Sequence, residues 1–330
     1  FFRALNIPDH QILWVPFAVR HGAEIVRKYD ISAVLVTAPP YSTLFCGSIL
    51  KRLKRVRFIA DLRDPIVGNI AQVDLLKPKG FYPRFMRKVH EKLEKHIVQA
   101  ADIVVTNTET HKKELKGKYK SGKLVTVRNS FDPDDYKDLP GKKFEKTTIV
   151  HTGAIYGLRK ADVLFRAINR LERKYAGDSL NLEVLFVGTV SDEFKAVVEA
   201  YQVTPYVSFM GQIPHLKAIE LMSRADILLL VKAISDNSLG QIPAKFFEYL
   251  GTGNPILCIG PSKSEVANLI REYKLGYVVE DDAAYMAEII DSLINHREFH
   301  SSKKDDFSSV SEFDNLTMAK RISRLIHRGH

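Results

Sequence analysis

Cysteine is scarce in this sequence: the 330 residues include only Cys46 and Cys258, and both lie in apolar stretches. Two isolated cysteines exclude the disulfide framework that stabilises small secreted domains, and they match no cysteine-based metal site. The eleven histidines are scattered, and the acidic cluster at residues 132–135 follows Asn129 and Ser130 in a predicted solvated loop. We therefore expect packed thiols in a reducing compartment, no bound metal and no cofactor.

Long apolar runs and a targeting segment are also missing. No run approaches the roughly 18 residues that a membrane-spanning helix needs. The opening FFRALNIPDHQILW lacks the basic start and the small-residue cleavage site of a signal peptide, which predicts a cytoplasmic protein. Because the sequence does not begin with Met, we expect its N-terminus to be trimmed or incomplete.

Acidic residues are few in the first half. Residues 1–146 hold 28 Lys and Arg against 16 Asp and Glu, a net charge of +12, whereas residues 147–330 carry −2. A basic half favours an anionic partner such as lipid head groups, nucleic acid or an anionic glycan. A surface that only keeps the protein in solution is the alternative, and composition leaves both open.

Short β-branched runs alternate with longer helical patterns along the chain. The predicted strands are residues 33–37, 57–61, 103–107, 124–128, 148–153, 182–188, 206–211, 226–231 and 255–260. The helical segments include residues 18–29, 83–100, 160–175, 215–224, 244–250 and 264–273. Continuous apolar strands joined through helices predict an α/β fold with parallel sheets covered on both faces. Sites in such sheets form at the carboxyl ends of strands.

The polar segment DLPGKKFEK at residues 138–146 contains Pro and Gly and is the best domain boundary. We predict two Rossmann-like domains facing across a cleft, residues 1–140 and 147–310, and a C-terminal helix over 311–330 that crosses back to the first domain. The first domain shows about four strands, where a doubly wound domain commonly has six, so it is expected to lack its first strands.

The segment QIPAKFFEYLGTGNPIL, residues 241–257, places one lysine and one glutamate on a short apolar helix. Pro243 suits the first turn, and Lys245 and Glu248 lie three residues apart on one face. An anion at the helix N-terminus would offset the cost of a cation there, and Glu248 can accept hydrogen bonds from two ribose hydroxyls. The pair predicts a nucleotide site; a surface ion pair worth about 0.2–0.5 kcal/mol is the alternative.

Two further segments place charges where strands end. In HTGAIYGLRK, residues 151–160, Gly153 permits close approach of a ligand to the backbone, and Arg159 can grip a diphosphate with its planar guanidinium. An ordinary strand–helix turn is the alternative. In FIADLRDP, residues 58–65, Asp61, Arg63 and Asp64 follow a buried strand, and buried charges are paired or functional. A structural Arg63–Asp64 pair is the alternative.

The segment KPKGFYPRFMRKVHEKLEKH, residues 77–96, mixes basic and aromatic side chains beside a helix start. This composition resembles an interfacial membrane contact, with the aromatics packing inward as the alternative. The predicted surface for a membrane or an acceptor comprises Lys79, Phe81, Tyr82, Arg84, Phe85, Arg87 and Lys88.

One resemblance links several of these stretches, namely TAPPYSTLFCG (37–47) with IADLRDP (59–65), IVHTGAIYGLR (149–159), VSFMGQIPHLKAIELMSRADILLLV (207–231) and, most specifically, IPAKFFEYLGTGNPILCIGP (242–261). They resemble the signatures of the group 1 glycosyltransferases of family 4, which have the GT-B fold. The likeness covers nearly the whole chain and extends to bacterial members with the Asp-x-Arg-Asp-Pro motif in the acceptor domain.

The resemblance implies a retaining, metal-independent transfer from a nucleotide-diphosphate sugar to a lipid-linked or polysaccharide acceptor, by an enzyme peripheral on the inner face of the cell membrane. Arg63, Asp61 and Asp64 would face the sugar and the acceptor, and Lys245 would act on the leaving group. Glu248 would bind the ribose and Arg159 the diphosphate. The full implied donor site is Gly153, Arg159, Gly188, Gln212, Ile213, Pro243, Lys245 and Glu248.

The sequence departs from the family pattern at Gly240, where many members carry a second glutamate, and at the glycine-rich N-terminal turn. A non-catalytic nucleotide-sugar-binding protein or subunit is therefore a second interpretation. A sugar epimerase on the same architecture needs acid and base residues that do not stand out. A nucleic-acid partner is not expected, because the basic residues lack a recognisable reading module.

Overall fold

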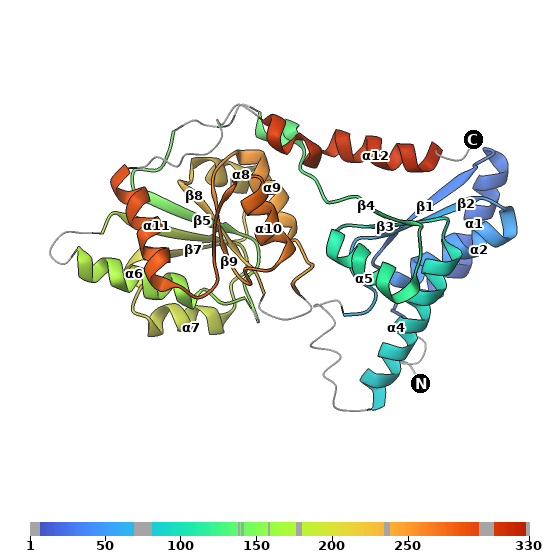
Figure 1. Cartoon of the computed structure of the whole chain (residues 1–330), viewed down its shortest axis with the longest axis horizontal. Helices are drawn as coiled ribbons and strands as arrows, with labels where there is room; N and C mark the ends of the chain where they lie inside the picture. The colour runs from blue at the N-terminus through green and yellow to red at the C-terminus, as the bar shows by residue number, and fades with distance from the viewer. Residues whose placement is uncertain are drawn as a thin grey trace. The chain divides into compact units, whose positions relative to one another are not determined.

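The computed structural model describes residues 7–68, 81–137, 139, 142–157, 159–175, 180–233, 238–296 and 307–327. The chain divides into two compact units, one formed by Phe1–Arg128 with Met318–His330 and the other by Asn129–Thr317. Figure 1 follows the chain through both. The polar segment at 138–146, predicted as the boundary, thus lies inside unit 2.

Unit 1 is built on a parallel sheet whose described strands follow the order β1-β2-β3-β4. The strands are β1 (Ala33–Ala38), β2 (Arg57–Leu62), β3 (Ile103–Thr106) and β4 (Leu124–Thr126). The unit also contains the helices α1 (Val15–Lys28), α2 (Leu44–Lys54), α4 (Phe81–Ala100), α5 (Glu109–Tyr119), most of α12 (Asn315–His327), and the short 3₁₀ helices η2 (Ile12–Trp14) and η3 (Tyr41–Thr43).

Both faces of the unit 1 sheet are covered. Phe58 of β2 packs with Leu44 of α2, Ile97 of α4 and Leu115 of α5 on one face. On the other face, Ile59 of β2, Val105 and Val127 pack against Leu325 of α12. Because β2 is buried from Phe58 to Leu62, it shows an uninterrupted apolar run up to Asp61 instead of an alternating pattern.

Unit 2 is built on a parallel sheet with the described strand order β10-β9-β8-β5-β6-β7. The strands are β5 (Thr147–Thr152), β6 (Leu182–Val187), β7 (Val207–Gly211), β8 (Ile227–Val231), β9 (Ile256–Ile259) and β10 (Gly276–Val279). Read from β5, the sheet grows first to β6 and β7 and then, on the other side, to β8, β9 and β10. This is the order of a doubly wound sheet, with its topological switch point between β5 and β8.

The helices of unit 2 lie in two layers, as Figure 1 shows. One layer holds α6 (Asp162–Lys174), α7 (Asp192–Ala200) and α11 (Ala283–His296), which share a core with Phe186 and Leu229. The other holds α8 (His215–Arg224), α9 (Ala244–Thr252) and α10 (Glu265–Glu272), which share a core with Val150 and Leu230. Three 3₁₀ helices, η4 (Pro133–Tyr136), η5 (Thr204–Tyr206) and η7 (Phe307–Phe313), complete the described elements.

The predicted α/β fold with parallel, Rossmann-like sheets is confirmed. The nine predicted strands are present within one or two residues, but β10 was not predicted. That strand has four residues, begins with Gly276 and is only half-buried until Val279, so it carries no continuous apolar signal. The predicted tail helix begins later, at Asn315, because residues 307–313 form η7.

Close packing of α2 on β2 generates a stability prediction. A methyl group at Gly47 would lie 2.1 Å from the ring of the fully buried Phe58. Gly47→Ala should therefore lower the free energy of unfolding of unit 1 by about 1–3 kcal/mol, the usual effect of overpacking. Urea denaturation followed by the fluorescence of Trp14, the only tryptophan of the sequence, measures this unit.

The matched control is Gly117→Ala in α5, where an added methyl group meets nothing within 4 Å. This change should raise stability by up to about 1 kcal/mol, because alanine loses less backbone entropy than glycine in a helix. Equal effects of the two substitutions would contradict the packing of α2 against β2.

Candidate functional site

A cavity of about 490 Å³ opens in unit 2 at the carboxyl ends of β5, β6 and β7. Residues from five segments line it: the end of β5 with its loop, the end of β6 with its loop, the β7–α8 connection, α8 and α9. They are Thr152, Gly153, Ala154, Val187, Gly188, Thr189, Gln212, Ile213, His215, Ala218, Lys245 and Glu248. Because β5 stands at the switch point and α9 follows β8, the cavity lies where a doubly wound sheet binds ligands.

Two glycines let the ends of β5 and β6 approach each other closely. Gly153 and Gly188 have φ of +92° and +129°, a region that other residues rarely adopt. A methyl group at Gly188 would lie 2.6 Å from the carbonyl oxygen of Gly153. The amide of Gly153 donates to Val187 at 2.7 Å, and that of Gly188 donates to Gly211 at 2.7 Å. One wall of the cavity is therefore bare backbone.

Lys245 lies in the first turn of α9 and extends back over the end of β5. Nζ of Lys245 lies 3.0 Å from Nε2 of His151. A methyl group at Gly153 would lie 3.0 Å from Nζ of Lys245. Burial lowers the pKa of Lys245 to about 7, and the nearby charge of Arg159 acts in the same direction. The amine is thus held against the backbone wall at considerable electrostatic cost.

Glu248 lies one turn further along α9 and lines the same cavity. Among the described residues, its carboxylate has no hydrogen-bond or ion-pair partner. The prediction that Lys245 and Glu248 share one face is confirmed, whereas the alternative of a surface ion pair between them is wrong, because Lys245 contacts His151. A half-buried carboxylate without a partner is a strong hydrogen-bond acceptor for a ligand.

The remaining predicted donor residues lie in or beside the cavity. Gln212 and Ile213 line it, and Nε2 of Gln212 donates to Oγ1 of Thr189 at 3.1 Å. Arg159 lies beside the lining, with its guanidinium 4.8 Å from the ring of Tyr156. Pro243 is the N-cap residue of α9 and precedes the first turn in which it was predicted to lie.

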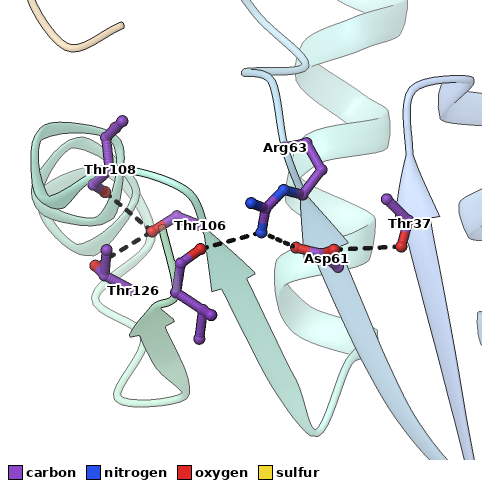
Figure 2. A network of polar contacts seen from close by, with 7 residues as sticks. Thr37, Asp61, Arg63, Thr106, Thr108 and Thr126 are labelled. Atoms are coloured by element: carbon purple, nitrogen blue, oxygen red, sulfur yellow. Dashed lines mark hydrogen bonds and ion pairs between the residues drawn. The ribbon is translucent and has the colours of Figure 1, made fainter. Parts of the chain in front are cut away.

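Unit 1 carries a separate polar cluster at the carboxyl edge of its sheet, drawn in Figure 2. Asp61 is only 5% exposed; Oγ1 of Thr37 donates to its Oδ2 at 3.2 Å, and Nη1 of Arg63 donates to its Oδ1 at 3.2 Å. The same Nη1 donates to the carbonyl of Val127 at 3.0 Å. The ion pair is therefore Arg63–Asp61, and the predicted alternative of an Arg63–Asp64 pair is wrong in its partner.

The electrostatics of this cluster follow from its burial. Burial raises the pKa of Asp61, and the Arg63 guanidinium and the hydrogen bond from Thr37 oppose that rise. Burial also raises the pKa of Asp64, again opposed by Arg63. In Figure 2 the cluster continues to Thr106, whose hydroxyl donates to the carbonyl of Thr108 at 3.0 Å. Arg63 is thus held by two acceptors, the carboxylate of Asp61 and the carbonyl of Val127, the residue that follows β4.

The predicted membrane or acceptor surface falls largely on the first turns of α4. Lys79 lies outside the described residues, and Phe81 and Tyr82 belong to α4 but their side chains are also outside the description. Arg84, Phe85, Arg87 and Lys88 are exposed, whereas Met86 is buried.

Across the described part of the chain, no helix is both long and apolar enough to cross a membrane. Within the same residues, no group of three or more His, Cys, Asp or Glu could hold a metal ion.

Several solved structures share this fold. Anabaena Alr3699/HepE in complex with UDP superposes with a TM-score of 0.67 at 15% identity, covering 93% of this chain and 81% of that one. Sucrose-phosphate synthase from Thermosynechococcus elongatus gives 0.63 at 14% identity, covering 96% and 78%. WaaG, a glycosyltransferase involved in lipopolysaccharide biosynthesis, gives 0.60 at 15%, covering 91% and 86%. No curated protein sequence is significantly similar to the chain.

These structures, together with the two parallel-sheet units, define a GT-B fold. The family described as "Glycosyl transferases group 1" matches residues 134–307, more than half of the chain. The chain belongs to this family, and it is a glycosyltransferase.

Among the residues to which sequence reasoning assigned no role, Thr189 and His215 line the cavity, and His151 contacts Lys245. His151 and Thr189 lie at or just after the ends of predicted strands, which is the signal that could have drawn attention to them. His215 begins α8 and lies 3.7 Å from Asp135 of η4. A scattered histidine carries no signal by itself, because its partners are distant in the chain.

The half-buried position of Lys245 generates a prediction that needs no ligand. In protein labelled with ¹³Cε-lysine, one lysine resonance should titrate near pH 7 and should disappear in Lys245→Arg. Below pH 7 the amine is a cation, and above it the neutral form prevails because burial penalises the charge. Titration of the Lys245 resonance above pH 9 would contradict the described burial of its amine.

Proposed function

We propose that this glycosyltransferase binds a nucleotide-diphosphate sugar in the unit 2 cavity and transfers its sugar to a lipid-linked or polysaccharide acceptor. The observation that carries the proposal is the arrangement on α9: an amine in the first turn and, one turn later, a carboxylate that has no partner among the described residues both line one cavity. A cation and a carboxylate at that separation suit a phosphate and a ribose, respectively.

The diphosphate would lie against the start of α9 and the backbone wall. The first turn of a helix supplies unpaired N–H groups and a partial positive charge. Lys245 adds a formal charge there, and Arg159 lies close enough to depress the pKa of Lys245. Gly153 and Gly188 leave room for phosphate oxygens to approach the main chain. An anion would relieve the repulsion between the two cations.

Glu248 would accept hydrogen bonds from the two ribose hydroxyls, and Gln212 and Ile213 would lie beside the base. The related fold of Anabaena HepE, solved with UDP and with UDP-glucose, supports a nucleotide sugar as the ligand class. Membership of family 4 is part of this proposal and rests on the signature at residues 242–261.

Leaving-group charge would be neutralised by protein groups, so we propose transfer without a bound metal and with retention of configuration. As the sugar–phosphate bond breaks, negative charge develops on the diphosphate, and Lys245, Arg159 and the α9 N-terminus are arranged to stabilise it. Retention follows from the family 4 assignment and from no geometry of this chain.

The acceptor would be held by unit 1, with Arg63 as the contact residue. Asp61 and Val127 anchor its guanidinium, and this anchoring limits the entropy that the side chain loses when it binds a ligand. Asp61 is nearly inaccessible, so we assign it to positioning Arg63 and not to contact with sugar. Asp64 remains a candidate for acceptor contact.

The first prediction for this function concerns Glu248. Calorimetry with UDP and GDP should detect binding, and Glu248→Ala should weaken it by about 1–3 kcal/mol, because the ribose hydroxyls lose their acceptor. Wild type should bind the ribose form more tightly than the 2′-deoxy form, and the variant should not discriminate. Glu288→Ala on the exposed face of α11 is the matched control and should bind like wild type.

Equal affinity of Glu248→Ala and wild type would remove the ribose assignment. Turnover of the nucleotide sugar in the presence of EDTA separates metal-independent from metal-dependent transfer. Binding without transfer to any lipid-linked or polysaccharide acceptor would favour the alternative of a non-catalytic nucleotide-sugar-binding protein.

Unit 1 is also proposed to contact an anionic membrane surface. Its residues 1–128 and 318–330 hold 28 basic and 11 acidic residues, a net charge of +17. The exposed side chains of Arg84, Phe85, Arg87 and Lys88 at the start of α4 combine charge with an aromatic ring, as interfacial segments do.

Vesicle sedimentation tests this surface. Wild type should bind vesicles of phosphatidylglycerol and phosphatidylcholine, and the double variant Arg84→Glu with Lys88→Glu should bind much less, because each charge near an anionic surface contributes about 1 kcal/mol. Arg170→Glu with Arg173→Glu on α6 makes the same change in charge within unit 2 and should retain binding. Equal loss in both double variants would show that only net charge matters.

A further inference from the structure

His151 is a fully buried residue of β5 whose Nε2 contacts Lys245, a residue of the cavity lining. Its side chain is 0% exposed and packs against the ring of Phe186 at a centroid distance of 5.7 Å. Its two ring nitrogens face different elements: Nδ1 lies 2.8 Å from the carbonyl oxygen of Leu229 in β8, and Nε2 lies 3.0 Å from Nζ of Lys245 in α9.

The partner of Nδ1 fixes where the proton of this imidazole resides. A carbonyl oxygen can only accept, so the contact with Leu229 requires a hydrogen on Nδ1. The hydroxyl of Tyr249 donates to the same oxygen at 3.0 Å and also accepts from the amide of Thr152 at 3.1 Å. A neutral imidazole that donates from Nδ1 leaves Nε2 as an acceptor.

The surroundings keep the ring neutral. Burial lowers the pKa of His151 well below its usual value, and the charges of Lys245 and Arg159 lower it further. No carboxylate contacts the ring among the described residues. With Nε2 as an acceptor, one of the three ammonium hydrogens of Lys245 points inward, which leaves two for a ligand.

We propose that His151 is a positioning residue: its Nδ1-protonated tautomer, held by the carbonyl of Leu229, presents Nε2 to Lys245 and thereby fixes the amine over Gly153 at the phosphate subsite. This inference rests on the proposed nucleotide site and deepens it. A free lysine side chain has several rotatable bonds, so an internal acceptor that selects one conformer reduces the entropy lost when the ligand binds.

A matched pair of substitutions tests the two nitrogens separately. His151→Asn retains a donor near the position of Nδ1 and removes the acceptor that faces Lys245, whereas His151→Gln retains an acceptor near the position of Nε2. Calorimetry with UDP and GDP should give about tenfold weaker binding for Asn than for Gln, the order expected when a charged group loses one hydrogen bond.

Two further readouts distinguish positioning from general damage to the fold. Affinity for uridine and guanosine, which lack phosphate, should be equal in both variants. The ¹³Cε resonance of Lys245 should titrate at a lower pH in His151→Asn than in wild type, because the ammonium loses its acceptor. When Lys245→Met is added to each variant, His151→Asn and His151→Gln should bind UDP and GDP with equal affinity.

The wild-type protein provides a test that survives if a variant fails to fold. Long-range ¹H–¹⁵N NMR should show His151 protonated on Nδ1 and unprotonated on Nε2 between pH 6 and 8. An imidazolium, or a proton on Nε2, would overturn the inference. Equal nucleotide affinity and equal Lys245 titration in Asn, Gln and wild type would overturn it as well. Wild type that binds neither UDP nor GDP would instead overturn the proposed function, while the two NMR measurements still test the His151–Lys245 contact.

Discussion

The parallel pairing of β5 with β8 is the constraint on which the unit 2 site depends. The sheet grows in opposite directions from this pair, so the loop after β5 and helix α9, which follows β8, both reach the cavity at the carboxyl ends of β5, β6 and β7. β5 contributes His151 and the turn at Gly153, and the helix after β8 contributes Lys245 and Glu248. The hydrogen bonds from His151 and Tyr249 to Leu229 tie the same three elements together beneath the cavity.

The charge of the chain is divided more sharply by its units than by its sequence halves. The first 146 residues carry +12, but unit 1 carries +17 and unit 2 carries −7. The difference arises because the C-terminal residues 318–330 add four basic side chains to unit 1, whereas the acidic segment at 132–135 belongs to unit 2. A strongly basic unit 1 suits an anionic acceptor or membrane, and the cations at the unit 2 cavity are local and half-buried.

Sequence patterns predicted the elements more reliably than the contacts. Uninterrupted apolar strands and the period of the helices placed β5, β8 and α9 closely, and the i,i+3 spacing correctly put Lys245 and Glu248 on one face. The same spacing left open a surface ion pair, which the structure replaces with a contact to His151, 94 residues away in the chain. The alternative of an Arg63–Asp64 pair also named the wrong partner, because the guanidinium donates to Asp61, which the fold of β2 places within 3.2 Å of it.

What the sequence determined by itself was the set of strands and helices, the parallel character of the sheets and the two residues of α9 that line the cavity, because these follow from local periodicity and helix geometry. The tertiary structure decided that most of α12 belongs to unit 1. It also decided that the ends of β5 and β6 approach each other at two glycines, and that a buried imidazole faces the amine of Lys245. These features depend on groups brought together from distant parts of the chain, and no local pattern encodes which of them will become neighbours.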